Sequence, residues 1–224
     1  YEKFTEFKKE FTSYAHSELL IYNKIGGETA PVSEGDSVWS MIQNDAIASL
    51  QETLSDPQNH SSLTELLARM EKAKHIYVTG GRLSGIAAAM LANKLRYLNL
   101  QVHDLSCGTV GDYIDQTALV QPEDLVIAIS FPRYTKRVVT ALEDMHRRGV
   151  PIALITDKGL SPVHPFADIV FHCATDSSAF LPCYTGCLAL IDVICQAVCM
   201  EHRSEITEYV RDLEKRLLAQ GVWM

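Results

Sequence analysis

The sequence has no hydrophobic run that could cross a membrane, because no stretch approaches the roughly 20 apolar residues that a spanning helix needs. It shows no secretory signal, since its first residues lack a continuous apolar segment. It also has no basic stripe of the kind typical of nucleic-acid-binding proteins, and its net charge is -8 with a pI of about 5.5. These absences predict a cytoplasmic protein without membrane contact, in which DNA binding belongs to a part that this chain lacks.

The six cysteines include no C-x-x-C pair. Four of them recur at multiples of four residues in a predicted helix: Cys183, Cys187, Cys195 and Cys199. Thiolates four residues apart on a helix can share a metal ion, so a metal site is one interpretation. Free cysteine, however, behaves as a small hydrophobic residue and is often buried. We therefore favour a role in the core, and expect no metal and no cofactor.

The chain divides at about residue 36. Aromatic and aliphatic residues near helical spacing predict a short helix within residues 1–21, and glycines and a proline make residues 22–36 a linker. The absence of an initiator methionine favours a chain cut from a longer protein. A helical stripe then predicts a helix that ends before Pro57, and Ser62-Leu63-Thr64-Glu65 reads as a capping box that opens another helix. The residues of this stripe are Trp39, Ile42, Ala46, Leu50 and Leu54.

From residue 75 onward, short apolar runs alternate with longer amphipathic segments. Strands are predicted at 75–79, 101–105, 125–129, 152–156 and 169–172, and helices at 84–98, 134–148, 188–200 and 206–218. The run 125–129 is almost entirely aliphatic, as expected for a parallel strand that is covered on both faces. The alternation predicts an α/β fold, a three-layer sandwich of about five parallel strands preceded by N-terminal helices.

Ligands of open parallel sheets sit beyond the carboxyl ends of the strands, where the strand order changes direction. The first turn there is Thr79-Gly80-Gly81-Arg82-Leu83-Ser84-Gly85. Glycines permit a sharp turn, after which the N–H groups of the next helix face an anion. Ser84 is either a ligand hydroxyl or a simple N-cap, and both interpretations stay open.

A dinucleotide site is an alternative interpretation of this turn. Gly80 and Gly85 match the outer glycines of G-x-G-x-x-G, and Asp104 ends the next strand where a ribose-binding acid would stand. Arg82, however, occupies the position of the middle glycine, which lets the backbone approach a pyrophosphate. We therefore favour a simpler anion.

The second turn, Ile129-Ser130-Phe131-Pro132-Arg133-Tyr134-Thr135, carries two hydroxyls and a guanidinium. Hydroxyls, helix N–H groups and arginine together form a phosphate site, and arginine adds bidentate geometry. The alternative is that Thr135 only caps a helix while Lys136 and Arg137 are solvated. The residues alone leave these interpretations equal.

The two turns, spaced by about 50 residues, resemble those of the SIS (sugar isomerase) domain, whose second loop reads Ser-x-Ser-Gly-x-Thr. This sequence keeps Ser130 and Thr135 but has Pro132 and Arg133 at the second serine and the glycine. The Ile-Ser-Phe-Pro-Arg-Tyr version is similar to a branch of RpiR/MurR-type bacterial transcriptional regulators. The resemblance spans roughly residues 37–200 and includes the later stretch from Ile155-Thr156-Asp157 to Ala167-Asp168.

The resemblance implies a flavodoxin-like SIS domain at 37–224, preceded at 1–36 by the remnant of a helix-turn-helix DNA-binding domain and its linker. Its implied function is to bind a phosphorylated sugar, to form a homodimer or higher homo-oligomer, and to control DNA binding by the missing domain. The expected sugar contacts include loops 106–117 and 174–184. The expected ligand-binding residues are Ser84, Ser130, Arg133, Thr135, Gly81, Arg82, Ser106 and Ser178.

An SIS-type phosphosugar isomerase is the main alternative, and an inert dimerisation scaffold is another. Isomerisation needs a positioned base, but no glutamate occurs between Glu143 and Glu201, and Tyr134 stands where many SIS loops carry one. The remaining candidates are His103, His164, His172 and Asp176. We expect these side chains to be structural and the chain not to be an enzyme.

Overall fold

The computed structural model describes residues 37–158 and 161–222, so the predictions for residues 1–36 lie outside the described residues. Five parallel strands form one sheet in the order β2-β1-β3-β4-β5. The strands are β1 (Ile76–Gly80), β2 (Val102–Asp104), β3 (Leu125–Ile129), β4 (Ile152–Thr156) and β5 (Ile169–His172). The predicted fold class is therefore confirmed. The chain reverses its direction of travel across the sheet between β1 and β3, which makes their carboxyl ends the switch point.

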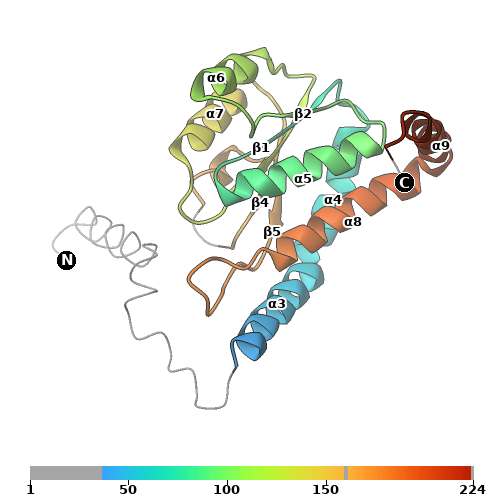
Figure 1. Ribbon diagram of the computed structural model, residues 1–224. Coiled ribbons are helices and arrows are strands. Elements are labelled where there is room, and N and C mark those ends of the chain that lie inside the picture. The colour runs from blue at the N-terminus through green and yellow to red at the C-terminus, as the bar shows by residue number, and fades with distance from the viewer. Residues whose placement is uncertain (1–36, 159–160, 223–224) are drawn as a thin grey trace.

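Helices cover both faces of the sheet, as Figure 1 shows. The helices α4 (Pro57–Met70), α5 (Leu83–Tyr97) and α8 (Thr185–Glu201) share one apolar core with the sheet. The helices α6 (Val110–Leu119) and α7 (Lys136–Arg147) share a second core on the opposite face. Every residue of β1, β3 and β4 is buried, which explains why these strands read as continuous apolar runs.

The ends of α5 and α7 agree with the sequence pattern, whereas the start of α4 does not. Asn99 follows α5 with a φ of 66° and Gly149 follows α7 with a φ of 78°, as left-handed residues just beyond a helix C-cap do. The capping box predicted at Ser62 is wrong, because α4 begins at Pro57 under an N-cap by Asp56. Proline suits a first helical position, and Ser62 instead donates its hydroxyl to the carbonyl of Val170 at 2.6 Å.

The segment expected as loop 106–117 contains most of the helix α6, which the sequence pattern did not predict. Thr109 caps α6: its hydroxyl accepts from the N–H of Asp112 at 3.2 Å, while the Asp112 carboxylate accepts from the N–H of Thr109 at 2.7 Å. Of the residues in α6, Tyr113 is buried. A helix with such a small buried surface leaves only a weak apolar period in the sequence.

Three of the four cysteines predicted in one helix lie in α8 and pack in or against the apolar core, whereas Cys183 precedes α8, which begins at Thr185. Cys187 is buried, and Cys195 and Cys199 are partly buried against the same core. Contact with Cys187, together with burial, raises the pKa of the Cys173 thiol. Among the described residues no group of three or more His, Cys, Asp or Glu side chains is placed to hold a metal ion.

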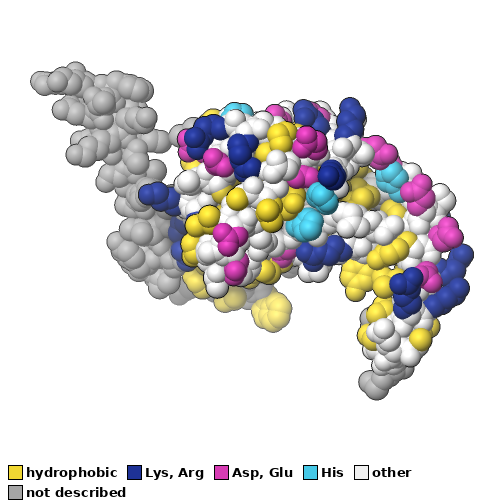
Figure 2. Space-filling view, turned by 90° about the horizontal axis from the view of Figure 1, so that it is seen from above, with side chains coloured by type: hydrophobic (Ala, Val, Ile, Leu, Met, Phe, Trp, Pro, Cys, Tyr) yellow, Lys and Arg dark blue, Asp and Glu magenta, His cyan; other side chains and the backbone are white. Residues whose placement is uncertain are grey.

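The helices at the two ends of the described chain leave apolar side chains uncovered. In α3 (Val38–Ser55), Trp39 is 87 % exposed, and Ile42 and Leu54 are also exposed. The last helix, α9 (Arg203–Ala219), projects from the rest of the molecule, with hydrophobic side chains gathered in the angle beside it (Figure 2). Among the described residues no single helix could span a bilayer, and α8 with α9 meets that test only as a pair bent by 103°.

Candidate anion-binding site

The turns that follow β1 and β3 meet at the switch point and form a small polar pocket. The loop before α8 closes its third side with Pro182 and Tyr184. Five of the predicted ligand residues line this pocket together with Phe131, Pro132 and Val138: Gly81, Arg82, Ser84, Ser130 and Thr135. Arg133 lines it as well, so six of the eight predicted residues are brought together.

Gly81 and Thr135 join the two turns by direct contact. A Cβ atom on Gly81 would lie 2.2 Å from Thr135 Oγ1 and 2.6 Å from its Cβ. Real side chains do not approach so closely, so only glycine allows this packing. Thr135 is the N-cap residue of α7, but its side chain makes no capping hydrogen bond. Thr135 therefore takes the N-cap position, as one interpretation expected, but its side chain does not cap the helix, and the residue lines the pocket.

Ser84 faces the loop before α8. It lies in the first turn of α5, whose N-cap residue is Arg82, so the interpretation of Ser84 as the N-cap is wrong. Its hydroxyl shares a hydrogen bond of 3.1 Å with the phenol of Tyr184, and Ser84 is only 5 % exposed. The Tyr184 ring stands edge-on to Phe131 with centroids 5.2 Å apart. Burial raises the pKa of Tyr184, so the phenol stays neutral and hydrogen-bonding.

Both arginines of the pocket have left-handed backbones, which non-glycine residues seldom adopt. Among the described residues three non-glycine residues have positive φ, and two of them are Arg82 at 59° and Arg133 at 67°. Arg133 lies close enough to Tyr184 to oppose the burial that raises the pKa of that phenol. Arg133 itself is among the residues that line the pocket. Backbone strain of this kind concentrates at functional sites, because the surrounding fold must hold it in place.

Ser130 is held firmly at the base of the pocket. Its N–H donates to the carbonyl of Ile155 at 3.0 Å, and its carbonyl accepts from the Thr156 hydroxyl at 2.6 Å. Ser130 is 4 % exposed. The cavity holds about 20 Å³, which is room for about one water molecule. An anion the size of phosphate therefore enters only if residues that line the pocket shift.

Two predicted ligand residues lie elsewhere. Ser106 donates its hydroxyl to the carboxylate of Asp104. Ser178 donates both its N–H, at 2.7 Å, and its hydroxyl, at 3.0 Å, to the carboxylate of Asp45 in α3. Neither serine lines the pocket. Arg137 is not simply solvated, because its guanidinium lies 5.0 Å from the centroid of the Tyr113 ring and its Nε is buried without a hydrogen-bond partner.

The candidate bases are not in the pocket either. His103 stacks on Tyr77 with ring centroids 4.8 Å apart, and His172 Nδ1 lies 3.8 Å from a carboxylate oxygen of Asp56. Tyr134 donates its phenol to Asp157 at 2.9 Å. Burial, followed by the nearby charge of Asp157, raises the pKa of Tyr134, so this phenol is a neutral donor.

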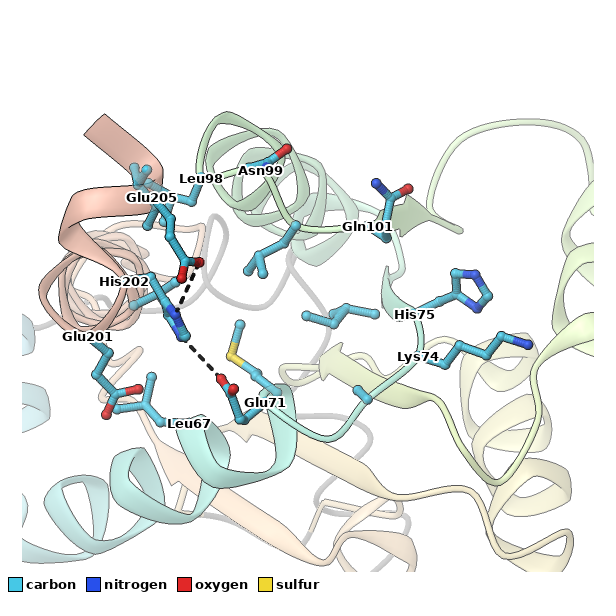
Figure 3. Close-up of a pocket in the computed structure, with 16 residues that line it drawn as sticks. Leu67, Glu71, Lys74, His75, Leu98, Asn99, Gln101, Glu201, His202 and Glu205 are labelled. Carbon is cyan, nitrogen blue, oxygen red and sulfur yellow. Dashed lines mark ion pairs between the residues drawn. The ribbon is translucent and has the colours of Figure 1, made fainter. Parts of the chain in front are cut away.

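A larger cavity of about 290 Å³ lies at the opposite edge of the sheet, where β1 begins and α8 meets α9 (Figure 3). His202 Nε2 is 3.2 Å from Glu71 and its Nδ1 is 4.0 Å from Glu205, and Glu201 also lines the cavity. Three carboxylates and one lysine, Lys74, line the larger cavity, whereas two arginines and no carboxylate line the smaller pocket. We therefore place the candidate anion site at the switch point despite its smaller volume.

Comparisons with known proteins identify the family of this domain. The model of the SIS domain family matches residues 69–197. Over 171 residues the chain is 26% identical to an uncharacterized HTH-type transcriptional regulator from Haemophilus influenzae. That match covers 76% of this chain and 58% of the regulator, so the chain spans less than two thirds of its relative.

Solved structures share the fold. The sugar isomerase domain of an RpiR transcription factor from Sphaerobacter thermophilus has a TM-score of 0.74 at 24% identity, covering 80% of this chain and 99% of that one. The Vibrio vulnificus NanR protein, solved in complex with ManNAc-6P, has a TM-score of 0.66 at 20% identity, with coverages of 84% and 72%. A phosphoheptose isomerase from Francisella tularensis has a TM-score of 0.60 at 16% identity, with coverages of 74% and 100%. Regulators and isomerases therefore both use this fold.

Proposed function

Because the chain belongs to the SIS domain family, we propose that it is the effector-binding and dimerisation domain of an RpiR-type transcriptional regulator that senses a phosphorylated sugar. The observation that carries the proposal is the pocket where Ser84, Ser130, Arg133 and Thr135 converge at the switch point. Two helix N-termini and two arginines meet there, and both attract a negative charge.

The chemistry of the pocket suits a phosphate group. Hydroxyls of Ser130 and Thr135 supply hydrogen bonds, and Arg133 supplies a charge that is not lost near neutral pH. Pro132 has no backbone N–H group. The Arg133 guanidinium therefore supplies a hydrogen bond that a backbone N–H group of this loop would otherwise donate. The phosphate occupies the pocket itself, and the sugar extends over the surface between loop 174–184 and the start of α5.

A sensor is favoured over an isomerase because the described lining of the pocket holds no Asp, Glu or His side chain. Proton transfer between neighbouring carbons needs such a base near the substrate. Tyr134, at the family position of a glutamate, donates to Asp157 and stays neutral. The proposed sensor thus has the fold of an isomerase and a phosphate-binding pocket, without a proton-transferring group beside it.

The regulatory part of the proposal draws on the relatives. The chain matches a regulator of the HTH type and covers 58% of it, which leaves room for a separate DNA-binding domain in the whole protein. The chain itself has a net charge of -8, and its sequence contains no basic stripe that would bind the phosphate backbone of DNA. DNA binding therefore belongs to that separate domain, and the proposed location is the cytoplasm.

Self-association is also part of the proposal. An apolar groove between α5 and α8 is lined by Tyr97, Val193, Cys195, Cys199 and Met200. Tyr97 is 59% exposed and Met200 71% exposed in the single chain. Such exposed apolar patches mark interaction sites. A second copy of the chain covers this groove, and a stable dimer would bury more than about 1,200 Å² in total.

A thermal-shift panel of hexose and amino-sugar phosphates tests the proposed effector class. We expect at least one phosphosugar to raise the melting temperature, because a ligand that binds only the folded state stabilises it. The same sugar without its phosphate is the matched control and should give no shift. If no phosphosugar shifts the melting temperature, or if Thr135→Ala and Ser130→Ala both leave the shift unchanged, the effector site is not this pocket.

A further inference from the structure

The helix α3 holds the loop that closes the anion pocket, and it does so with small polar side chains. Asp45, Ser49 and Thr53 follow one another at intervals of four and therefore share one face of α3. Ser49 and Thr53 are 3 % and 1 % exposed, whereas Trp39 on the apolar side of the same helix is 87 % exposed. The most buried side chains of the helix are thus polar, whereas part of its apolar stripe stays exposed.

The contacts of this polar face span the whole loop between β5 and α8. At its start, Ser49 Oγ donates to the carbonyl of Ala174 at 2.6 Å, and Thr53 Oγ1 accepts from the N–H of the same residue at 3.1 Å. In its middle, the Asp45 carboxylate accepts from the Ser178 N–H at 2.7 Å and from the Ser177 hydroxyl at 3.0 Å. Five hydrogen bonds between α3 and this loop involve these three side chains.

At the end of the loop, α3 meets the first turn of α8. Ser49 Oγ accepts from the N–H of Gly186 at 3.0 Å. A Cβ atom on Gly186 would lie 2.2 Å from Thr53 Oγ1 and 2.6 Å from the Ser49 carbonyl, so only glycine lets the two helices approach this closely. Interiors packed at this density respond to small shifts by moving together.

The same loop carries two walls of the pocket. Pro182 and Tyr184 line it, and the Tyr184 phenol bonds to Ser84 at 3.1 Å. From the pocket, a chain of direct contacts therefore runs through Tyr184 and the loop to Asp45, Ser49 and Thr53. In the sequence, residues 1–36 and the N-cap residue Ser37 directly precede α3.

We infer that Asp45, Ser49 and Thr53 form a coupling element that transmits occupancy of the anion pocket to α3, and through it to the chain that precedes Ser37. The inference rests on the proposed function. The cavity has room for about one water molecule, so an anion that enters displaces Tyr184 and the loop that carries it. The loop transmits this shift to the residues of α3 that it contacts. The three side chains act as positioning residues and do not touch the anion.

Coupling of this kind is reciprocal, so the contacts should also tune the affinity of the pocket. The 224-residue chain is tested with inorganic phosphate as the probe, in hydrogen-exchange mass spectrometry and in calorimetry. In the unmodified chain, phosphate slows amide exchange in residues 80–86, 130–136 and 174–186, and also in the Asp45–Thr53 part of α3. In Asp45→Ala the slowing persists in residues 80–86 and 130–136 but is lost from α3. The phosphate affinity changes by at least about fivefold.

Asn44→Ala is the matched control, because Asn44 is an exposed neighbour on α3 and should respond like the unmodified chain. Ser178→Ala removes one of the hydrogen bonds to Asp45 from the loop side and should show a weaker form of the same effect, which keeps the test valid if Asp45→Ala unfolds. The outcomes separate the two ideas. If phosphate protects neither residues 80–86 nor 130–136, the proposed function fails. If it protects both but α3 responds identically in Asp45→Ala and the unmodified chain, the coupling alone is overturned.

Discussion

Gly81 and Thr135 belong to turns that follow different strands, yet they touch so closely that a Cβ on Gly81 would lie 2.2 Å from the threonine hydroxyl. This contact fixes the distance between the two turns that form the anion pocket. It also fixes the Thr135 side chain, which caps no helix N–H group and is therefore left for a ligand. The absence of a Cβ atom at Gly81 therefore permits the close packing that sets the geometry of the site.

Replacing Gly81 by alanine should damage both stability and binding. The added methyl group would push Thr135 and the first turn of α7 away, and overpacking of this kind costs about 1–3 kcal/mol. We expect a lower melting temperature and loss of phosphosugar binding in calorimetry.

Gly111→Ala is the control for that substitution. The nearest atom to a Cβ there is Thr109 Oγ1 at 3.7 Å, an ordinary contact in the helix α6. Alanine is favoured over glycine inside a helix by about 0.5–1 kcal/mol, so this variant should be slightly more stable and bind normally. A Gly81→Ala protein that behaves like Gly111→Ala would show that the two turns are free to separate.

Arg133 should contribute more to anion binding than its neighbour Lys136. Arg133 lines the pocket, whereas Lys136 is exposed outside it. Thr135→Ala should weaken binding by about 1–3 kcal/mol, roughly 5- to 150-fold, and Arg133→Ala should weaken it at least as much. Lys136→Ala should change the affinity little, apart from a screened long-range effect. Calorimetry at two salt concentrations measures this contrast, and equal losses for Arg133→Ala and Lys136→Ala would mean that only the overall charge matters.

The sheet and the pocket turns could be predicted from sequence because each depends on local pattern. Buried parallel strands read as apolar runs, and turns beyond their carboxyl ends carry the ligands, so Ser84, Ser130 and Thr135 were found together. The contact of Gly81 with Thr135 could not be predicted, since it depends on how two turns about 50 residues apart pack in three dimensions.

Other features went unpredicted because they break the usual rule of amphipathic helices. The role of α3 was hidden because its attached side carries Asp45, Ser49 and Thr53 rather than its apolar stripe. Small polar residues at intervals of four, each one position before a residue of that stripe, are the signal that could have revealed it. Ser178 was expected at the ligand, but the carboxylate that binds it lies 133 positions away in the chain.

The folded chain should lose stability at alkaline pH because of its buried tyrosines. Burial raises the pKa of Tyr113, Tyr134 and Tyr184 above that of an exposed phenol, which is 10.0. The unfolded chain therefore loses these protons first. The stabilisation is complete below pH 10 and declines as the pH rises through the higher folded-state values. Unfolding followed by circular dichroism, with phenolate absorbance recorded in parallel, should show both signals changing together.

Tyr209→Phe is the comparison for the buried phenols, because Tyr209 lies on the projecting helix α9, outside both apolar cores. It should leave the alkaline midpoint unchanged, whereas Tyr113→Phe should move the midpoint upward. Phenolate absorbance that rises fully before the fold is lost would show that the tyrosines are accessible.

The chain should not isomerise phosphosugars. Incubation with fructose 6-phosphate or glucosamine 6-phosphate should give no turnover above background, because the described lining of the pocket holds no carboxylate or imidazole. Conversion that is lost in His164→Ala or Asp176→Ala would place the chain among the isomerases instead.

The groove between α5 and α8 should be the surface through which two copies associate. Light scattering at micromolar concentration should give about twice the 25.0 kDa mass of one chain. Met200→Glu and Tyr97→Glu place a charge in the groove, and burying an unpaired charge is strongly unfavourable, so each should shift the mass toward the monomer. Ile114→Glu is the matched control, because Ile114 is 61% exposed on α6, which covers the opposite face of the sheet. If Ile114→Glu dissociates the dimer and the groove variants do not, the copies associate through the α6 side of the molecule.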